Sequence, residues 1–398
     1  MRRTVLFVAG AAAVVAVVAG AVGAFLATGP SGVRTVTDVS GLTRPAAPTQ
    51  ARWVIRDLGL LAGTWVGVSD RGEVVWQGAD GHARLWESGR TIDLGTLGGK
   101  YSAPSAVNGR GQVVGWSATQ PEGGNATWHA FLWENGRMRD LGTLGGRASY
   151  ATATNDRGVV VGWAETDRRE NSSENLATPG DTHRYTVHGG TRHAFMWRDG
   201  KMRDLGTLPD GEQSYAWAIN PSGLVVGQSQ RDFDGDSGFV WQNGRLLGLG
   251  GLGCEMGSEV SAINASGEVV GESCDKDGQP SAFLWQNGRI RSLPLEWADR
   301  INNRGQVLGG ETLLENGQAI PLGFYAVDLN ERGQVVGGVE EPREHAMVWH
   351  SGTTTDLGTL PGGSKSYASA INNKGQIVGW ATTKNGQKHA VLWTLRSG

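Results

Sequence analysis

Short runs of apolar residues alternate with tight-turn signals along the chain from Arg52 onward. The runs are four to six residues long, are rich in Val and aromatic residues and show no helical spacing, so they predict β-strands. A clear example is His129-Ala-Phe-Leu-Trp133, which an Asn-Gly pair connects to Arg137-Met-Arg-Asp140. Asn and Gly tolerate the positive φ angles of tight turns. The pattern therefore predicts short antiparallel strands joined by tight turns.

The pattern is repetitive, and each repeat contains four predicted strands, which we name A to D. Strand A ends at an Asn, as in Tyr215–Asn220, strand B is a Val-Val-Gly run, strand C contains Ala-Phe-Leu-Trp, and strand D ends in Asp-Leu-Gly. A four-stranded repeat of about 40–45 residues has the size of a propeller blade. The sequence therefore predicts an all-β fold, an eight-bladed β-propeller, or seven blades if the short repeat around Leu314 joins a neighbour. The defining strand C position is held by Trp86, Trp133, Trp197, Trp241, Trp285, Leu314, Trp349 and Trp393.

The two ends of the repetitive region complement each other. It starts with a lone copy of strand D, Trp53–Gly59, and ends with a copy of strand C, His389–Trp393, that no strand D follows. A ring explains this arrangement, because the N-terminal strand then completes the last blade and leaves no exposed sheet edge. We therefore expect these two segments to pair.

The N-terminus has the features of an export signal. Arg2 and Arg3 precede an uncharged run rich in Ala, Val and Gly, residues 4–28, which predicts a hydrophobic helix. The run is long enough to span a bilayer as a signal anchor, and its Ala-Gly-Ala sequence at 19–21 also fits a cleaved signal peptide. The protein is therefore expected outside the cytoplasm, either anchored in the cell membrane by residues 4–28 or secreted.

Three regions follow from these patterns. Residues 1–28 form the signal peptide or signal anchor, residues 29–51 a linker rich in Pro, Thr, Ser and Gly, and residues 52–398 the predicted propeller.

Three recurring strings in the repeats resemble the HAF repeat, an extracellular repeat of bacterial proteins. They are His-Ala-Phe-Leu-Trp, Asp-Leu-Gly-Thr-Leu-Gly-Gly and Ile-Asn-x-x-Gly-Gln-Val-Val-Gly, and they cover nearly all of residues 52–398. The repeats at Trp241 and Leu314 depart from the pattern because they lack the His-Ala start. The resemblance implies an exported bacterial repeat protein without an established activity, and it transfers no catalytic residue.

Composition excludes several classes of protein. Of 398 residues, 63 are Gly, without a period of three, and 39% are hydrophobic, which excludes collagen and a disordered chain. The formal net charge of −3 favours neither nucleic acid nor an anionic membrane surface as a partner.

The connections between strands B and C are the variable part of each repeat. Binding residues are often carried by loops on a rigid scaffold, so the face with these connections is the predicted ligand face. Trp116, Trp163 and Trp380 follow the Val-Val-Gly run there and are candidates for a stacking rim, with packing between blades as the alternative. Arg184 and Tyr185 lie in the longest connection and are further candidate ligand contacts, with a solvated loop as the alternative.

One connection contains a possible calcium site. Asp232, Asp234 and Asp236 alternate around Gly, as carboxylates that bind Ca²⁺ often do. The expected later ligands are missing, since Val240 and Asn243 occupy their positions, so an acidic surface loop is the alternative. No other cofactor is indicated.

Cys254 and Cys274, the only cysteines, lie ten residues on either side of Asn264. In an antiparallel hairpin they would face each other, and export to an oxidising compartment favours a disulfide between them.

The recurring His of strand C is predicted to be structural. It is present in most repeats, whereas a catalytic site is expected to break the symmetry of a repeat protein. The five copies are His82, His129, His193, His345 and His389.

Two functions remain open. The first is a non-catalytic binding or scaffolding module at the cell surface, for an unidentified polymer, peptide or protein. The alternative is an extracytoplasmic hydrolase or lyase with its site at the central channel, where a ring brings distant carboxylates together. The sequence contains no Gly-x-Ser-x-Gly, His-Glu-x-x-His or phosphate-loop motif, so no catalytic residue is assigned.

Overall fold

The computed structural model describes residues 52–120, 127–167, 175–176, 185–186, 191–209, 211–230, 236–339 and 344–396. Over these residues the fold is all-β, with strands and turns and no helix. None of them belongs to a helix long and apolar enough to cross a membrane. The predicted N-terminal helix and linker lie outside the described residues.

The strands follow the predicted repeats, which we number 1 to 8 in chain order. Within each repeat the neighbouring strands are antiparallel. Repeats 1 to 4 consist of β1 (Arg52–Val68), β2 (Val74–Gly78), β3 (Ala83–Glu87) and β4 (Arg90–Asp93); β5 (Ser102–Val107), β6 (Val113–Ala118), β7 (Trp128–Glu134) and β8 (Arg137–Asp140); β9 (Gly145–Thr154), β10 (Val160–Thr166), β13 (Arg192–Arg198) and β14 (Lys201–Gly206); and β15 (Gln213–Ile219), β16 (Val225–Gln230), β17 (Asp236–Gln242) and β18 (Arg245–Gly248). The short strands β11 (Asn175–Leu176) and β12 (Tyr185–Thr186) pair with each other in the long connection of repeat 3.

The second half of the chain continues the same order. The short repeat around Leu314 forms a four-stranded sheet of its own, β23 to β26, so it does not join a neighbour. Repeats 5 to 8 consist of β19 (Gly253–Ile263), β20 (Val269–Asp275), β21 (Pro280–Gln286) and β22 (Arg289–Ser292); β23 (Arg300–Ile301), β24 (Val307–Gly309), β25 (Thr312–Glu315) and β26 (Gln318–Pro321); β27 (Tyr325–Leu329), β28 (Val335–Gly338), β29 (Ala346–His350) and β30 (Thr353–Asp356); and β31 (Ser366–Ile371), β32 (Ile377–Thr382) and β33 (Lys388–Arg396).

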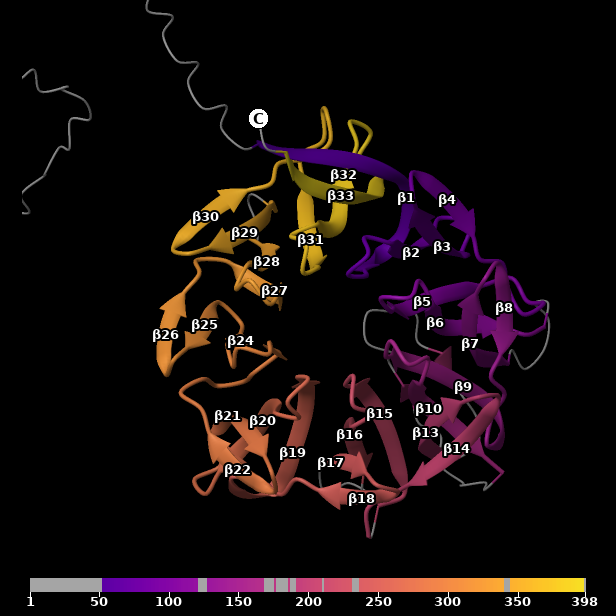
Figure 1. The fold of residues 1–398 in the computed structure, drawn as a ribbon, viewed down its shortest axis with the longest axis vertical. Coiled ribbons are helices and arrows are strands. Elements are labelled where there is room, and N and C mark those ends of the chain that lie inside the picture. The colour runs from indigo at the N-terminus through magenta and orange to yellow at the C-terminus, as the bar shows by residue number, and fades with distance from the viewer. Residues whose placement is uncertain are drawn as a thin grey trace, which may run out of the picture. The chain divides into compact units, whose positions relative to one another are not determined.

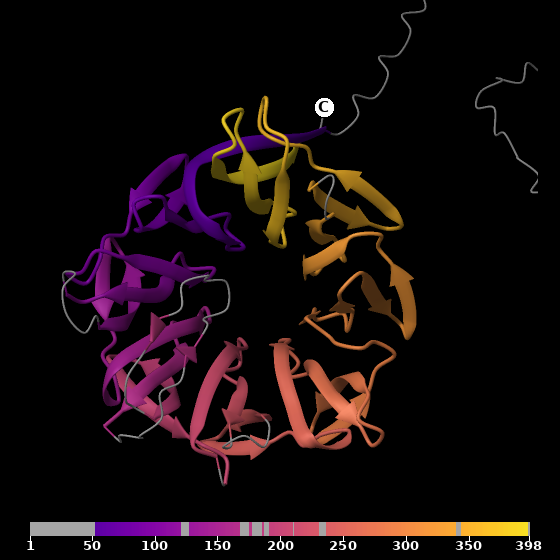
Figure 2. The ribbon, with the colours of Figure 1, turned by 180° about the vertical axis from the view of Figure 1, so that it is seen from behind.

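The predicted pairing of the two ends is confirmed. The first half of β1 pairs with β33, where Ile55 lies opposite Trp393, and the second half pairs with β2. β1 therefore supplies the fourth strand of repeat 8 and the first strand of repeat 1. Figures 1 and 2 show the sheets following one another in chain order around a common centre, with the indigo β1 beside the yellow β33.

Side chains from neighbouring sheets form the core. One cluster joins Val114 and Leu132 of repeat 2 to Val160 and Phe195 of repeat 3, and all four are buried. Equivalent clusters join the other neighbouring repeats, so each sheet is packed on both faces. This explains why the strands are apolar on both faces.

The Val-Val-Gly motif has a steric cause. Strand A of repeat 3 is irregular, because the register of β9 shifts opposite Val161 and Gly162. A Cβ atom at Gly162 would overlap the carbonyl oxygen of Tyr150 on β9. Only glycine therefore lets strand B approach strand A at this position.

The Asn at the end of strand A links neighbouring repeats. Its side-chain oxygen accepts backbone N–H groups of its own turn, as Asn220 does from Ser222 and Leu224. Its Nδ2 donates to the backbone carbonyl of the equivalent residue in the next repeat. Each of these bonds is 2.8–3.2 Å long, and each joins one residue to the next in the series Asn108, Asn155, Asn220, Asn264, Asn302, Asn330, Asn372 and Ser69 of repeat 1.

The recurring His has the structural role that its repetition predicts. His Nδ1 lies 2.7–3.1 Å from an Asp carboxylate at the end of strand D, and in repeat 5 a Ser281–Ser292 hydrogen bond of 2.8 Å takes the same place. The pairs are His82 with Asp93, His129 with Asp140, His193 with Asp204, His345 with Asp356, and His389 with Asp57 of β1.

Two of these carboxyls titrate at unusually low pH. Burial by itself would raise the pKa of Asp140, but hydrogen bonds from His129 and the backbone N–H of Gly142 outweigh it and lower this pKa. At Asp93, burial is likewise outweighed by the backbone N–H of Gly95, His82 and Arg84, so its pKa is also lowered.

We expect Gly162→Ala to lower the free energy of unfolding by about 1–3 kcal/mol, because the new methyl group has no space. Urea unfolding followed by Trp fluorescence measures the change. The control is Gly248→Ala, since Gly248 is exposed and a Cβ there meets only ordinary contacts. Equal stability of the two variants would contradict the steric explanation.

We also expect acid to destabilise the protein through Asp140. A carboxyl group whose pKa is lower in the folded than in the unfolded state stabilises the fold at pH values above its pKa in the unfolded state, about 3.9. This stabilisation is lost as the pH falls through the pKa of the folded state. The melting temperature of Asp140→Asn should therefore lie below wild type at about pH 6 and approach it at about pH 3. Asp199→Asn, on an exposed turn, is the control. A difference independent of pH would contradict the assignment.

Candidate functional site

The predicted stacking rim is not exposed. Trp163 and Trp380 are only 8% and 5% accessible, and they stack on Tyr150 and Tyr367 of strand A with ring centroids 6.1 and 6.4 Å apart. Trp116 is half-buried against the edge of Trp128. The ligand-binding prediction for Trp163 and Trp380 is therefore corrected, because the strand A aromatics cover both rings.

The other predicted site residues are placed only in part. Arg184, Asp232 and Asp234 lie outside the described residues, and only the backbone of Tyr185 and Asp236 is described. The calcium site stays a prediction.

The disulfide also stays a prediction. Cys274 is buried on β20, whereas the side chain of Cys254 lies outside the described residues. Gly253 on β19 pairs with Asp275 on β20, and each cysteine is the chain neighbour of one of these two residues. The described residues contain no free cysteine.

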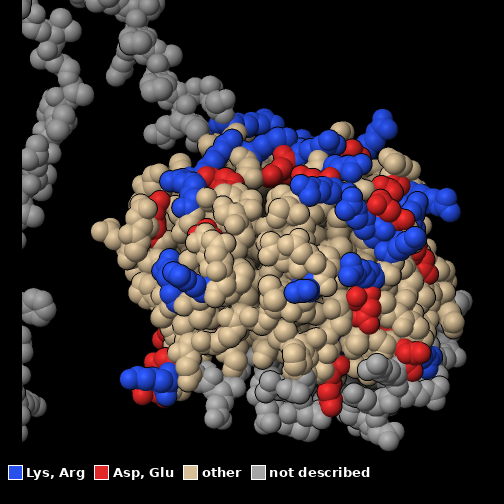
Figure 3. All heavy atoms as spheres, turned by 60° about the horizontal axis from the view of Figure 1, so that its bottom comes forward, with Lys and Arg blue, Asp and Glu red and all other residues tan. Residues whose placement is uncertain are grey.

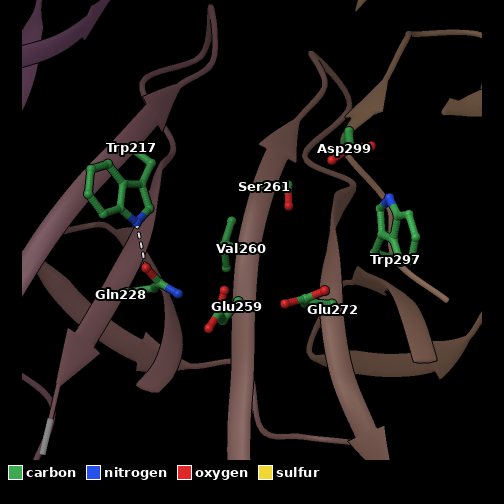
Figure 4. A pocket seen from close by; sticks show the side chains of 8 residues that line it. All are labelled: Trp217, Gln228, Glu259, Val260, Ser261, Glu272, Trp297 and Asp299. Atoms are coloured by element: carbon green, nitrogen blue, oxygen red, sulfur yellow. Dashed lines mark hydrogen bonds between the residues drawn. The ribbon is translucent and has the colours of Figure 1, made fainter. Parts of the chain in front are cut away.

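A cavity of about 360 Å³ lies between strands A and B of repeats 4 and 5 and the segment that precedes β23 of repeat 6 (Figure 4). Its walls combine two tryptophans with three carboxylates, and they contain no lysine or arginine among the described residues. The lining residues are Trp217, Gln228, Glu259, Val260, Ser261, Glu272, Trp297 and Asp299.

The cavity lies where repeat 5 departs from the pattern. Glu259 on β19 pairs directly with Glu272 on β20, so two carboxylates face each other across adjacent strands. Other repeats have uncharged pairs at the same two positions. These are Tyr150 with Trp163 in repeat 3, Tyr215 with Gln228 in repeat 4, and Tyr367 with Trp380 in repeat 8.

Repeat 4 provides an oriented amide and an aromatic wall. Trp217 Nε1 donates a 2.8 Å hydrogen bond to Gln228 Oε1, and the ring of Trp217 stacks on Tyr215 with centroids 5.6 Å apart. Gln228 is only 9% accessible, and its Nε2 points toward the cavity (Figure 4). This Nε2 can therefore donate a hydrogen bond to a ligand or to solvent in the cavity.

Repeat 6 provides the opposite wall. Trp297 is 37% exposed, and its ring lies beside Gly310, where a Cβ atom would come within 3.1 Å of it. Asp299 Oδ2 accepts the backbone N–H of Gly310 at 3.2 Å. Gly310 thus leaves room for the ring of Trp297, and its backbone N–H donates a hydrogen bond to the carboxylate of Asp299.

The three carboxylates are not arranged for a single metal ion. Among the described residues, only Asp80, His82 and Asp93 bring three possible ligand atoms within 4.8 Å of one another. That group lies on repeat 1, where Arg84 forms an ion pair with both aspartates. The cavity carboxylates are spread more widely and suit a ligand of several atoms.

Asp328 is a carboxyl group with a shifted pKa, and it lies outside the cavity. Burial raises its pKa, although Arg300 at 3.8 Å and the backbone N–H groups of Ile371 and Leu329 act in the opposite direction. The Ile371 bond joins β27 to β31, so Asp328 connects repeats 7 and 8. Its role is structural.

The surface seen in Figure 3 has charges of both signs. Lys and Arg gather along one edge, with Asp and Glu among them, and much of the remaining view is uncharged.

The motifs that recur along the sequence do not indicate this cavity. The signal that indicates it is a difference between repeats, a carboxylate pair at two positions that are uncharged in repeats 3, 4 and 8. Trp217, Trp297 and Asp299 carry no sequence signal of their own, because their proximity depends on how the sheets pack.

No family model matches the chain, and no curated protein matches it either. The HAF-repeat resemblance therefore stays a prediction. Among solved structures, the chain is similar to a puromycin-hydrolyzing peptidase from Mycobacterium tuberculosis, with 15% identity, a TM-score of 0.46 and coverage of 80% of this chain and 58% of that one.

Two further structures have similar scores. A puromycin hydrolase is 16% identical, with a TM-score of 0.42 and coverage of 83% of this chain and 52% of that one. A gluconolactonase from Xanthomonas campestris is 14% identical, with a TM-score of 0.35 and coverage of 89% and 99%. This chain spans little more than half the length of the two puromycin hydrolases. Likeness of this degree transfers no activity or substrate to it.

Proposed function

We propose that residues 52–398 form a closed eight-bladed β-propeller that acts outside the cytoplasm as a non-catalytic binding module. The pairing of β1 with β33 and the Asn372–Ser69 bond, both of which join repeat 8 to repeat 1, support closure. The arginines and the apolar run at the N-terminus support export and a membrane anchor, and the HAF-like strings agree with an extracellular location.

The ligand site of this module is the cavity of repeats 4 to 6. The observation that carries the proposal is a cavity between two tryptophans that is lined by the Glu259–Glu272 pair, a departure from the repeat pattern. Departures from a local rule concentrate at functional sites. The site thus lies on the inner strands and not on the variable connections between strands B and C.

Trp297→Ala should weaken ligand binding by about tenfold or more, because an aromatic ring in contact with a ligand contributes about 1–2 kcal/mol. The full-length protein in detergent micelles is applied to glycan and peptide arrays, and wild type and variant are compared. Trp65→Ala is the matched control, since Trp65 is 40% exposed but does not line the cavity. Equal capture by wild type and Trp297→Ala would exclude the cavity as the ligand site.

A hydrolase or lyase acting in the same cavity is the second candidate. It is favoured by the same two carboxylates, because glycoside cleavage uses a pair of Asp or Glu side chains that face each other. Among the described lining residues there is no histidine, cysteine or lysine, and Ser261 carries the one hydroxyl group.

Glu272→Gln separates the two candidates. A binding module releases no reducing ends from the oligosaccharides that it binds, in wild type or variant. If wild type releases reducing ends and Glu272→Gln does not, although the variant still binds the oligosaccharide, the protein is a hydrolase or lyase and the binding proposal is replaced.

A further inference from the structure

We propose that the end of the protein that carries the A–B and C–D turns lies on the anionic lipid headgroups of the membrane that holds residues 4–28. The inference rests on one part of the proposed function, the export and anchoring of the chain. It adds a second interaction surface, whose residues do not line the cavity.

The turns lie side by side at one end of the described sheets. Within a repeat, the A–B and C–D turns share an end because neighbouring strands are antiparallel. Between repeats, the side-chain amide at the start of each A–B turn donates to the next turn, from Asn108 through to Ser69 of repeat 1. We name this end the turn face. Its A–B turns run from Ser69–Glu73 of repeat 1 to Asn372–Gln376 of repeat 8.

Basic residues recur on the turn face and are exposed. The position directly before the glycine of the A–B turn is basic in six of the eight repeats, and Ser222 and Ser266 take it in repeats 4 and 5. A second set lies farther out, since the first residue of β4, β8, β14, β18 and β22 is an exposed Arg or Lys. The six exposed residues of the A–B turns are Arg71, Arg110, Arg157, Arg304, Arg332 and Lys374.

Acidic side chains of the same turns accept hydrogen bonds within the protein. Asp156 accepts the backbone N–H of Gly109 in the preceding turn at 2.7 Å, and equivalent bonds hold the acids of the A–B turns in repeats 1 and 7. The half-buried Glu315 accepts the side-chain amide of Gln306 at 2.7 Å and lies 3.5 Å from Arg304. These carboxylates thus help to join the turns.

Several of the basic side chains bond to backbone carbonyls. Arg157 donates to Ser222 at 3.3 Å, Arg332 to Lys374 at 3.4 Å, and Lys374 to Arg71 at 2.9 Å. A carbonyl group has no net charge, so these bonds orient the basic groups along the turn face without neutralising them. Their charge is therefore available to an anionic partner.

The opposite end of the sheets has the reverse charge pattern. Strand D begins with a basic residue at the turn face and ends with an exposed Asp in repeats 1 and 2, as β4 (Arg90–Asp93) and β8 (Arg137–Asp140) show. The formal net charge of −3 averages over these two ends. Figure 3 shows such an uneven distribution, with Lys and Arg gathered along the upper edge of the view and Asp and Glu among them.

The chain enters the described repeats at the turn face. The first half of β1 takes the place of strand D in repeat 8, and it begins with Arg52 opposite Arg396. Strand D starts after the C–D turn in repeats 1 to 7, so Arg52 lies at the same end as these turns. Residues 29–51 therefore connect the proposed anchor to the basic end of the repeats.

This attachment favours a bilayer over a soluble polyanion. Each Lys or Arg near an anionic lipid surface strengthens binding by about fivefold. The anchor keeps the repeats close to the bilayer, so the attraction needs only to orient them. The variable B–C connections, at the opposite end, then point away from the membrane.

The test is energy transfer from a fluorophore on the full-length protein to an acceptor on lipid headgroups. Thr353→Cys places the fluorophore on the turn face and Ser364→Cys at the opposite end, and both positions are exposed. The vesicles consist of phosphatidylcholine alone or mixed with phosphatidylglycerol. With phosphatidylglycerol, transfer from Thr353→Cys should exceed that from Ser364→Cys at least about twofold and decrease as salt increases. The chain without either substitution measures labelling of its own cysteines.

Arg71→Gln/Arg110→Gln, made in the Thr353→Cys protein, tests the role of charge. Loss of two basic residues should weaken the lipid contact about tenfold or more, so transfer should be lost at a lower salt concentration. The matched control is Lys276→Gln/Lys384→Gln, which removes the same charge from exposed B–C connections. An unchanged salt dependence of the arginine variant would overturn the inference. The melting temperatures of both variants confirm that they are folded.

The outcomes separate the inference from the function on which it rests. If the protein floats with phosphatidylcholine vesicles but the two labelled positions give equal transfer with phosphatidylglycerol, the anchor stands and the inference is wrong. If inorganic polyphosphate changes the emission of the Thr353→Cys label and phosphatidylglycerol does not, the turn face binds a soluble anion and the inference is also wrong.

Flotation with phosphatidylglycerol vesicles alone would support the lipid contact and replace the anchor. If the protein floats with neither kind of vesicle, the proposed anchor fails and the inference fails with it. Capture on the arrays that depends on Trp297 would still leave the binding function intact.

Discussion

The antiparallel pairing of β1 with β33 is the interaction on which the rest of the structure depends. It gives repeat 8 its fourth strand, buries Trp393 beside Ile55, and places Asp57 against His389. The paired residues are separated by more than 300 positions in the chain, so the pairing has a large entropic cost of loop closure. Without it, β2 and β33 would each present an unpaired edge to solvent, which invites aggregation.

Most repeats satisfy the same physical requirements in the same way. A glycine lets the irregular strand A approach strand B, an Asn satisfies its turn and reaches the next repeat, and a His–Asp pair joins strands C and D. Such solutions recur because neighbouring repeats pack against each other in the same way. Repeat 5 differs at Glu259 and Glu272, which pair with each other and line one cavity.

The same logic explains why the first candidate residues were misassigned. Trp163 and Trp380 recur after Val-Val-Gly and were expected at an open rim, but a recurring aromatic has a recurring partner, Tyr150 or Tyr367. The residues of the cavity are unlike their counterparts in the other repeats. In a repeat protein, a difference between repeats is therefore a better indicator of a site than a shared motif.

The sequence by itself determined the strands, the tight turns, the four-stranded repeats and the pairing of the two ends. These features depend on apolar periodicity and turn chemistry, which act over about ten residues, and on a missing strand at one end that matches an extra strand at the other. Only the tertiary structure decided that Trp217, Glu259 and Trp297 share a cavity. They belong to three different repeats, and the distance between their side chains is set by how neighbouring sheets pack, which no local pattern specifies.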